Sequence, residues 1–240
     1  MNPWDNLSGY FNTHKDATEI NPGAADNILI AWPSVIKGIK TVQAEGKGLK
    51  ALDYGCGGGS FAAELLKHEY EVVGCDSSSE MIAVAKKNLE EIPFYVCDFP
   101  DVKKLEEAPF DLITGIMVFQ FIDDIEGCIR SLVEILKSGG VFAFAVFNPD
   151  YVRNNHGKGK LFDGFENPHV PAQGYMCVGE EIRIPVFMRT ESEYDRFASS
   201  VGLGRVHADK PPFTEAFLQK YPSGTDTTEP EYLVMVYAKK

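Results

Sequence analysis

The chain has 240 residues, of which 44% are apolar and 24% charged, and its formal net charge at pH 7 is −12. This length is enough for one α/β domain with a modest cap, and the composition is that of an ordinary globular protein. The negative charge argues against a nucleic acid or an anionic membrane as the main partner, because both attract basic surfaces.

Targeting and cysteine signals are weak. No run of 18 apolar residues is present, and the N-terminal sequence MNPWDNLSGYFNTHK lacks the basic and apolar regions of a signal peptide. The five cysteines are an odd number, and no pair has C-x-x-C spacing, so a structural zinc site is not expected. We expect a cytoplasmic protein with reduced thiols, no metal and no membrane partner, as a monomer or homodimer.

Residues 1–48 precede the first predicted strand, and a helix is expected around residues 35–42. This segment contains four aromatic residues, Trp4, Tyr10, Phe11 and Trp32. Tyr10 and His14 are four residues apart, which is the spacing of neighbours on one helix face. We expect residues 1–48 to form a helical cap or lid.

Residues 51–60, ALDYGCGGGS, predict a short buried strand, a glycine turn and a helix that begins at Ser60. Gly55 and Gly57, with Gly59 after them, allow a sharp turn and a close approach of the backbone to a ligand. The following helix directs its unpaired N–H groups at the turn. Asp53 opens the motif, and the whole pattern predicts a ligand site.

Asp76 ends the next apolar run, residues 72–75, and so lies at the tip of the second predicted strand. A carboxylate there is placed to accept hydrogen bonds from both ribose hydroxyls of an adenosine. Ser77 and Glu80 predict a capping box for the next helix. The dinucleotide fingerprint G-x-G-x-x-G would end on Ser60 instead of glycine or alanine, and G-x-x-x-x-G-K-[ST] is absent. The loop therefore predicts a nucleoside cofactor other than a dinucleotide.

The pattern D-x-G-x-G-x-G, with an aspartate 17 residues after its last glycine, resembles the first motif of class I S-adenosylmethionine-dependent methyltransferases. Three later segments are similar to further motifs of the family. They are the strand PFYVCDF at 93–99, the strand FDLITGI at 110–116, and EILKSGGVFAFAVFNP at 134–149, in which serine replaces the proline of the family's LKPGG. The resemblance covers about residues 49–148 and indicates a small-molecule methyltransferase of the quinone-biosynthesis or natural-product type.

Alternating strands and helices from residue 49 to residue 147 predict βαβ units and a parallel sheet. The resemblance implies an α/β, Rossmann-like doubly wound sheet, mostly parallel with an antiparallel last strand, plus a small cap. We expect a single methyltransferase domain in four parts: the cap or lid 1–48, the cofactor-binding core 49–148, a cap insertion 148–189, and the rest of the core sheet, 190–240. A hairpin, 175–178 with 182–187, is expected inside the insertion.

The resemblance also implies S-adenosylmethionine as the methyl donor, S-adenosylhomocysteine as the product, and roles for individual residues. Asp53 and the glycine loop would hold the methionine part, and the Ile116 carbonyl would meet its ammonium group. Asp76 would hold the ribose, Met81 would stack on the adenine, and Asp98 and Phe99 would contact the adenine edge. Purely structural roles stay open for three of these residues. Asp53 could hydrogen-bond the turn, Asp76 could be a helix N-cap, and Met81 could be a core residue. The predicted set is Asp53, Gly55, Cys56, Gly57, Asp76, Ser77, Met81, Asp98, Phe99 and Ile116.

The acceptor is less defined, because methyl transfer needs from the protein mainly the positioning of the reactants and the exclusion of water. A hydroxyl acceptor benefits from a general base, whereas an amine or an enolate carbon needs mainly orientation. Candidate bases are Tyr10, His14, His156, His169 and His207. Gln120 stands where relatives often carry histidine. The aromatic residues of both cap segments favour a small, partly apolar or aromatic acceptor. A protein or RNA methyltransferase, a nucleotide-dependent oxidoreductase and a non-catalytic binder are the alternatives.

Overall fold

The computed structural model describes residues 3–7, 20–21, 24–157, 161–165, 173–178, 182–221 and 228–240. Its main sheet has seven strands in the order β3-β2-β1-β4-β5-β10-β9. The bounds of these strands are β1 Lys50–Tyr54, β2 Glu71–Asp76, β3 Phe94–Val96, β4 Phe110–Ile116, β5 Leu136–Phe147, β9 Leu203–Asp209 and β10 Tyr232–Lys239. β1 to β5 run parallel, and β10 pairs antiparallel with both β5 and β9.

Seven α-helices and four shorter helical turns connect the strands in the described part of the chain. The α-helices are α1 Trp32–Lys40, α2 Ser60–Lys67, α3 Ser79–Asn88, α4 Ile125–Glu134, α5 Pro149–Asn154, α6 Glu191–Ser200 and α7 Glu215–Lys220. The turns include η1 Pro3–Leu7, η3 Asn27–Ala31, η4 Val102–Lys104 and η5 Phe119–Phe121.

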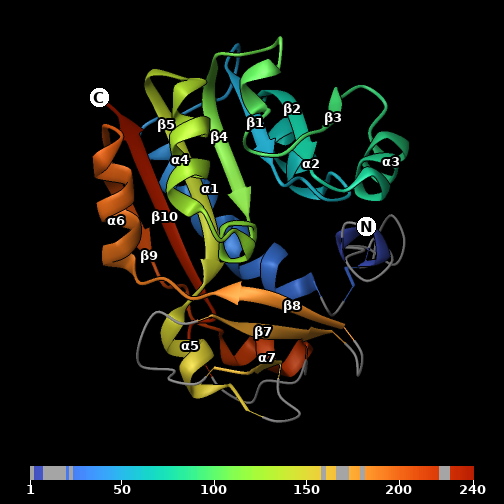
Figure 1. Ribbon diagram of the computed structural model, residues 1–240, viewed down its shortest axis with the longest axis vertical. Coiled ribbons are helices and arrows are strands. Elements are labelled where there is room, and N and C mark those ends of the chain that lie inside the picture. Colours follow the sequence, from blue (N-terminus) through green and yellow to red (C-terminus); the bar gives the residue numbers. More distant parts are fainter. Residues whose placement is uncertain are drawn as a thin grey trace.

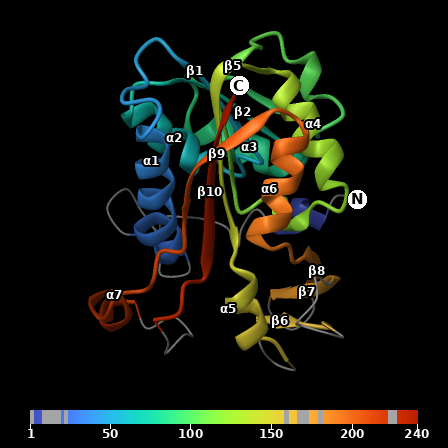
Figure 2. The same ribbon diagram turned by 90° about the vertical axis from the view of Figure 1, so that its left-hand side faces the viewer.

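The sheet lies between two layers of helices, as the edge-on view in Figure 2 shows. One apolar core joins the sheet to α1, α2 and α3, and a second joins its other face to α4 and α6. Because both faces are covered, a central strand needs apolar residues on both sides. The β5 sequence VFAFAVF at 141–147 meets this requirement, and each of its residues is buried.

A three-stranded sheet forms the cap, in the order β6-β7-β8 with bounds Phe162–Asp163, Gln173–Val178 and Ile182–Phe187. The expected hairpin is present as β7 and β8, which pair from Gln173 opposite Phe187 to Val178 opposite Ile182. In Figure 1 this sheet and α5 lie below the main sheet, where β5 ends and β10 begins. A third apolar core joins the cap to Leu7, Met81 and Phe147.

The fold prediction is confirmed: the sheet is Rossmann-like and mostly parallel, with an antiparallel last strand and a small cap. Thr190 and Glu193 form the reciprocal capping box at the start of α6. One local expectation was wrong by a residue, because the N-cap of α3 is Ser78 and not Ser77. Three consecutive serines, 77–79, offer the same hydroxyl, and the choice among them depends on Asp76.

Candidate functional site

A cavity of about 640 Å³ opens at the carboxyl ends of β1, β2 and β4. This edge is where open α/β sheets bind ligands. The predicted cofactor residues that line the cavity are Asp53, Gly55, Cys56, Gly57, Asp76, Ser77, Met81, Asp98 and Ile116. Phe99 does not line it; its side chain packs on the apolar core on the α4 face. The sequence therefore located the cavity, and the roles of single residues as cofactor contacts stay predictions.

The glycine loop after β1 forms one wall of the cavity. Gly55 and Gly57 have φ values of +68° and +51°, a backbone region that favours glycine. A Cβ on Gly55 would lie 2.3 Å from Cγ2 of Val118, whereas a Cβ on Gly57 would meet no atom within 4 Å. The first glycine is thus required by packing, and the second leaves open space on the cavity side for a ligand.

Asp76, at the end of β2, connects the glycine loop to α3. Its Oδ2 accepts the Gly57 N–H at 3.0 Å, and its Oδ1 accepts the Ser78 N–H at 2.8 Å. The second bond fixes Ser78 as the N-cap, whose Oγ accepts the Met81 N–H at 3.2 Å. Burial raises the pKa of Asp76, against the effect of these hydrogen bonds. Each carboxylate oxygen keeps a lone pair for a ligand hydroxyl.

Asp53 lies on β1 opposite Thr114 of β4 and is only 1% exposed. Thr114 Oγ1 donates to Asp53 Oδ1 at 3.0 Å, and Asp53 Oδ2 has no hydrogen-bond partner among the described residues. Burial raises the pKa of this carboxyl to about 7, although the Thr114 hydrogen bond acts in the opposite direction. A buried acceptor without a partner is costly, so this oxygen is suited to a donor supplied by a ligand.

Asp98 lies just beyond β3 at the same edge. Its Oδ1 accepts the hydroxyl of Tyr54 at 3.1 Å and the backbone N–H of Phe99 at 2.7 Å. Tyr54 is buried and stacks on Phe119 with a centroid distance of 5.9 Å. The Phe99 N–H, predicted to meet adenine, is thus bonded to Asp98 in this structure, while the Asp98 side chain itself is exposed to the cavity.

The end of β4 forms the middle of the cavity, with Ile116, Met117 and Val118 in its wall. Met117 has a φ of +57°, which non-glycine residues adopt rarely, and its N–H donates to the Ala145 carbonyl at 2.9 Å. Such backbone outliers persist where the surroundings hold them, often at functional sites. This turn directs the chain away from the sheet and into η5, whose Phe121 also lines the cavity.

The sequence did not predict the polar end of the cavity near β10. There Asp26 and Asn27, from the start of the α1 region, meet Glu231 and Tyr232, where β10 begins. The hydroxyl of Tyr232 donates to Asp26 Oδ2 at 2.5 Å across 206 positions of sequence. The available signal was an acidic residue directly before the last apolar run, EYLVMVY at 231–237.

The predicted general bases are not brought to the cavity within the described residues. Tyr10, His14 and His169 lie outside the described residues. His156 is described but lines no part of the cavity; it forms an isolated bridge with Phe162. His207 is on β9, packed against Gly38 of α1. Gln120 is 2% exposed and also lies outside the cavity wall.

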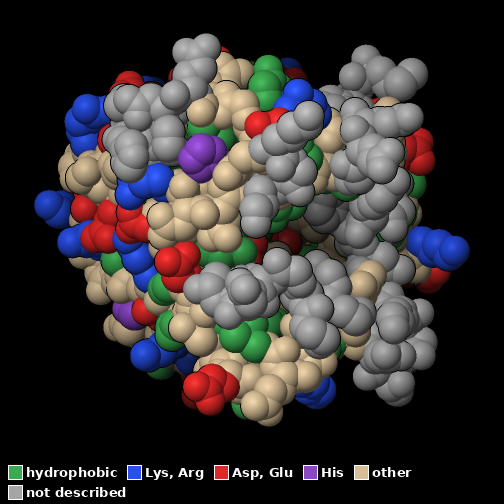
Figure 3. All heavy atoms as spheres, turned by 90° about the horizontal axis from the view of Figure 1, so that it is seen from below, with side chains coloured by type: hydrophobic (Ala, Val, Ile, Leu, Met, Phe, Trp, Pro, Cys, Tyr) green, Lys and Arg blue, Asp and Glu red, His purple; other side chains and the backbone are tan. Residues whose placement is uncertain are grey.

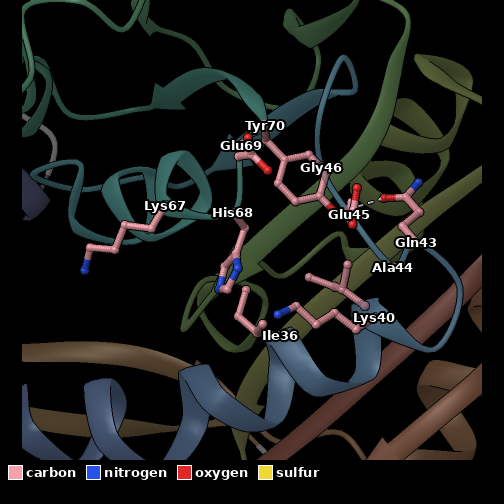
Figure 4. Close-up of a pocket in the computed structure, with 11 residues that line it drawn as sticks. Ile36, Lys40, Gln43, Ala44, Glu45, Gly46, Lys67, His68, Glu69 and Tyr70 are labelled. Atoms are coloured by element: carbon pink, nitrogen blue, oxygen red, sulfur yellow. Dashed lines mark hydrogen bonds between the residues drawn. The ribbon is translucent and has the colours of Figure 1, made fainter.

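A smaller cavity, about 170 Å³, lies at the opposite end of the sheet, where β2 begins (Figure 4). Its labelled residues come from α1, from the end of α2 and from the loops that follow these helices, and the Tyr70 hydroxyl donates to Gln43 Oε1 at 3.2 Å. Amino ends of parallel strands are not where such sheets bind ligands. In the described ranges, no three His, Cys, Asp or Glu side chains are grouped to hold a metal ion.

The larger cavity fits an adenosine cofactor with a cationic end. The open side of Gly57 leaves room beside the loop, and Asp53 Oδ2 offers an unused acceptor. Asp76 offers two more acceptor oxygens at the tip of β2. S-adenosylmethionine carries ribose hydroxyls, an ammonium group and a sulfonium. Its hydroxyl and ammonium donors would therefore meet the carboxylate acceptors of the cavity, and its positive charges would meet their negative charge.

Comparison with known proteins agrees with this geometry. Residues 52–144 match the family model described as a methyltransferase domain. The match covers less than half of the chain and assigns this segment to a methyltransferase domain. The family's methyl donor is S-adenosylmethionine, so the predicted family and cofactor are confirmed.

The fold and the curated relatives extend this result. A structure titled as a putative S-adenosylmethionine dependent methyltransferase from Listeria monocytogenes superimposes with a TM-score of 0.68 at 18% identity, over 87% of this chain and 97% of that one. A ubiquinone biosynthesis O-methyltransferase of Coxiella burnetii is 32% identical over 108 residues, 44% of this chain and 46% of its own length. A tRNA 5-carboxymethoxyuridine methyltransferase of Escherichia coli K12 is 29% identical over 152 residues, 55% and 58% of the two chains.

The chain thus spans about half the length of the curated relatives that it matches. The family match covers residues 52–144, and the cap and the polar end of the cavity lie outside that range. In the described ranges, no helix has the length and apolar character needed to span a membrane.

Proposed function

We propose that this protein transfers a methyl group from S-adenosylmethionine to a small, partly apolar acceptor. The observation that carries the proposal is the continuity of the cavity from the glycine loop to an apolar region on the cap side. That region is lined by Trp4, Phe121, Phe147, Leu161 and Met176. The bound cofactor supplies an electrophilic methyl group on a sulfonium, so the protein contributes position, orientation and a dry environment.

The chain's own residues divide the cavity into three parts. Asp76 and Asp98 lie at the ends of β2 and β3 and would hold the ribose and the adenine edge. Asp53 and the Ile116 carbonyl would receive the ammonium group near β1 and β4. The apolar region beyond β4 would hold the acceptor and exclude water from the reacting atoms.

Two cap segments would close the acceptor region. In η1, Trp4 packs edge-to-face on Phe121 with a centroid distance of 4.7 Å, and Leu7 is fully buried. Ser78 Oγ donates to Asp5 at 2.7 Å, which connects η1 to the N-terminus of α3. We propose that the N-terminal segment and the 148–189 insertion act as a lid that closes over an occupied site.

Methylation of tRNA is a second candidate, favoured by the similarity to the Escherichia coli tRNA methyltransferase. The net charge of −12 opposes it, because phosphate binding requires a basic surface. Figure 3 shows the cap end of the molecule, where the described side chains include both acidic and basic residues in a mixed arrangement. A small-molecule acceptor is therefore the better-supported proposal.

The test is the release of S-adenosylhomocysteine from S-adenosylmethionine, measured by mass spectrometry with panels of small amines, phenols and bulk tRNA. We expect release above background with at least one small-molecule class and none with tRNA. Release that depends on tRNA alone would replace the small-molecule proposal with the second candidate. Binding of NAD in preference to S-adenosylmethionine would reject methyl transfer altogether.

A further inference from the structure

The end of the cavity nearest β10 contains two carboxyl groups, those of the half-buried Asp26 and the buried Glu231. Asp26 Oδ2 accepts the Tyr232 hydroxyl, and Asp26 Oδ1 has no partner among the described residues. Glu231 is only 7% exposed, and its backbone carbonyl, but not its carboxylate, accepts a described hydrogen bond, from the Asn148 N–H at 2.7 Å. The pair therefore presents unused acceptor oxygens to the cavity.

Two further polar groups at this end lack a partner in the described structure. The indole N–H of Trp32 belongs to a side chain that is 7% exposed and lines the cavity. The side-chain oxygen of Asn27 is likewise buried without a hydrogen bond. Buried polar groups in native proteins are nearly always satisfied, so several orphans around one cavity indicate a ligand that completes them.

The electrostatics of the cavity select the charge of that ligand. Among the described lining residues are five carboxyl groups, from Asp26, Asp53, Asp76, Asp98 and Glu231, and no Lys, Arg or His. Burial raises the pKa of Asp26, and burial together with the charge of Asp26 raises the pKa of Glu231 well above its ordinary value. The other titratable groups next to this pair are the phenol of Tyr232, which is bonded to Asp26, and the phenol of Tyr151, which lies near Tyr232. No described cationic side chain of the cavity wall would balance the charge of an anionic ligand group.

The strand order separates this end from the cofactor side. β10 lies four strands from β2, whose tip carries Asp76, which corresponds to roughly 19 Å at the usual strand spacing. It lies three strands from β1, which carries Asp53, or roughly 14 Å. The β4 turn with Ile116 and Met117 stands between them. The Asp26–Glu231 pair therefore belongs to the acceptor side of the cavity.

Given methyl transfer as the proposed function, we propose that Asp26 and Glu231 bind an amino group of the acceptor and take its proton, so that the acceptor is a small amine with an apolar body. An ammonium group has three N–H donors, which suit the unpartnered oxygens of Asp26 and Asn27 and the carboxylate of Glu231 in the cavity wall. A hydroxyl offers a single donor and would leave acceptors unsatisfied. A carboxylate offers none.

The proton transfer is required by the chemistry of amines. A protonated amine has no lone pair, so one N–H proton must first pass to a carboxylate oxygen of the pair, which becomes a neutral carboxyl. The freed lone pair then forms the N–C bond to the methyl carbon as the C–S bond breaks, and the electrons of that bond remain on sulfur. A carboxyl with a raised pKa is the better acceptor for this proton. It returns the proton to water after product release.

The experiment compares three probes with one body and different ends: 2-phenylethylamine, 2-phenylethanol and 3-phenylpropionate. Calorimetry at pH 7.5 measures the affinity of each for protein saturated with S-adenosylhomocysteine. We expect the amine to bind at least tenfold more tightly than the other two. Glu231→Gln and Asp26→Asn should each weaken amine binding at least tenfold, whereas S-adenosylhomocysteine affinity stays within twofold. Glu215→Gln, an exposed acid on α7, is the matched control and should change neither.

Melting temperatures identify a variant that fails to fold. Tyr232→Phe then takes the place of that variant, because it removes only the hydroxyl bonded to Asp26. Equal binding of the alcohol or the carboxylate would overturn the inference, as would unchanged amine binding in the folded variants or no binding of any probe at millimolar concentration. These results leave S-adenosylhomocysteine binding intact. Loss of that binding in the wild type would instead reject the proposed function on which the inference rests.

Discussion

Asp53 and Thr114 face each other across the β1–β4 pair, and the threonine hydroxyl is the only described side chain that hydrogen-bonds the buried carboxyl, at 3.0 Å. This arrangement holds one carboxylate oxygen in place and leaves the other unbonded at the cavity. The site is therefore prepared for a ligand at a cost to the free protein, because a buried carboxyl is hard to ionise there.

The pH dependence of stability tests this account of Asp53. Its pKa is raised from an ordinary 3.8 to about 7 in the folded state, so the folded protein binds more protons than the unfolded chain between these values. The free energy of unfolding should then decrease as pH rises from about 4 to about 7. Asp53→Asn should flatten this decrease in urea titrations of the ligand-free protein. An unchanged slope in the variant would show that Asp53 is not the group responsible.

Asp76→Ala should weaken S-adenosylmethionine binding by about 1.5–3 kcal/mol, the range for hydrogen bonds to a charged group. The carboxylate is at the tip of β2 and also fixes the Gly57 and Ser78 N–H groups. Calorimetry measures the change. Asp101→Ala, which removes an acid from an exposed ion pair with Lys104, is the control and should bind normally. Unchanged affinity in Asp76→Ala would reject the ribose assignment.

Gly57→Ala and Gly139→Ala form a matched pair for the glycine loop. Both glycines have positive φ values, +51° and +75°, and a Cβ on either would meet no atom within 4 Å. Each alanine should cost about 1–2 kcal/mol of folding free energy through the left-handed backbone. Only Gly57 lines the cavity, so only its variant should also lose S-adenosylhomocysteine affinity, by at least tenfold. Equal binding in both variants would make Gly57 a purely structural glycine.

Arg189 connects the cap to the turn that follows β4. Its guanidinium donates to the carbonyls of Phe119, Ile122 and Asp123 at 3.2, 2.7 and 2.8 Å. Arg189→Ala should lower the free energy of unfolding by about 2–3 kcal/mol in urea titrations, because hydrogen bonds to charged groups are strong. Arg196→Ala, on the exposed side of α6, should change it by less than about 0.5 kcal/mol. A similar loss in both variants would contradict this role.

Removal of residues 1–19 tests the lid. The deletion takes away η1, with Trp4 and Leu7, and keeps Asp26 and α1 in the chain. We expect turnover to be abolished while the sheet domain stays folded by circular dichroism and binds cofactor weakly. Normal turnover in the truncated protein would leave the 148–189 insertion as the remaining wall of the acceptor region.

Much of the cofactor side was predictable because its signals are local. The turn from Asp53 to Gly59 and the acid at Asp76 follow from the sequence of single βα units, and these units meet at one sheet edge by topology. Phe99 was predicted to contact adenine, but it does not line the cavity, and its backbone N–H donates to Asp98. The N-cap of α3 was misplaced by one residue among three equivalent serines.

The acceptor side was not predictable by the same means. Asp26 and Tyr232 become partners only when β10 inserts beside β5, over a separation of 206 positions. In the sequence, Asp26 resembles an ordinary surface acid, and the only local signal for Glu231 is its place directly before the last apolar run. The predicted histidines had the right chemistry for a base, but neither His156 nor His207 lines the cavity.

The central claim is that the cavity binds S-adenosylmethionine, and calorimetric titration of the wild-type protein with S-adenosylhomocysteine tests it most directly. We expect one site per chain with micromolar or tighter affinity, and no measurable binding of NAD under the same conditions. The absence of S-adenosylhomocysteine binding, or tighter binding of NAD, would contradict the account.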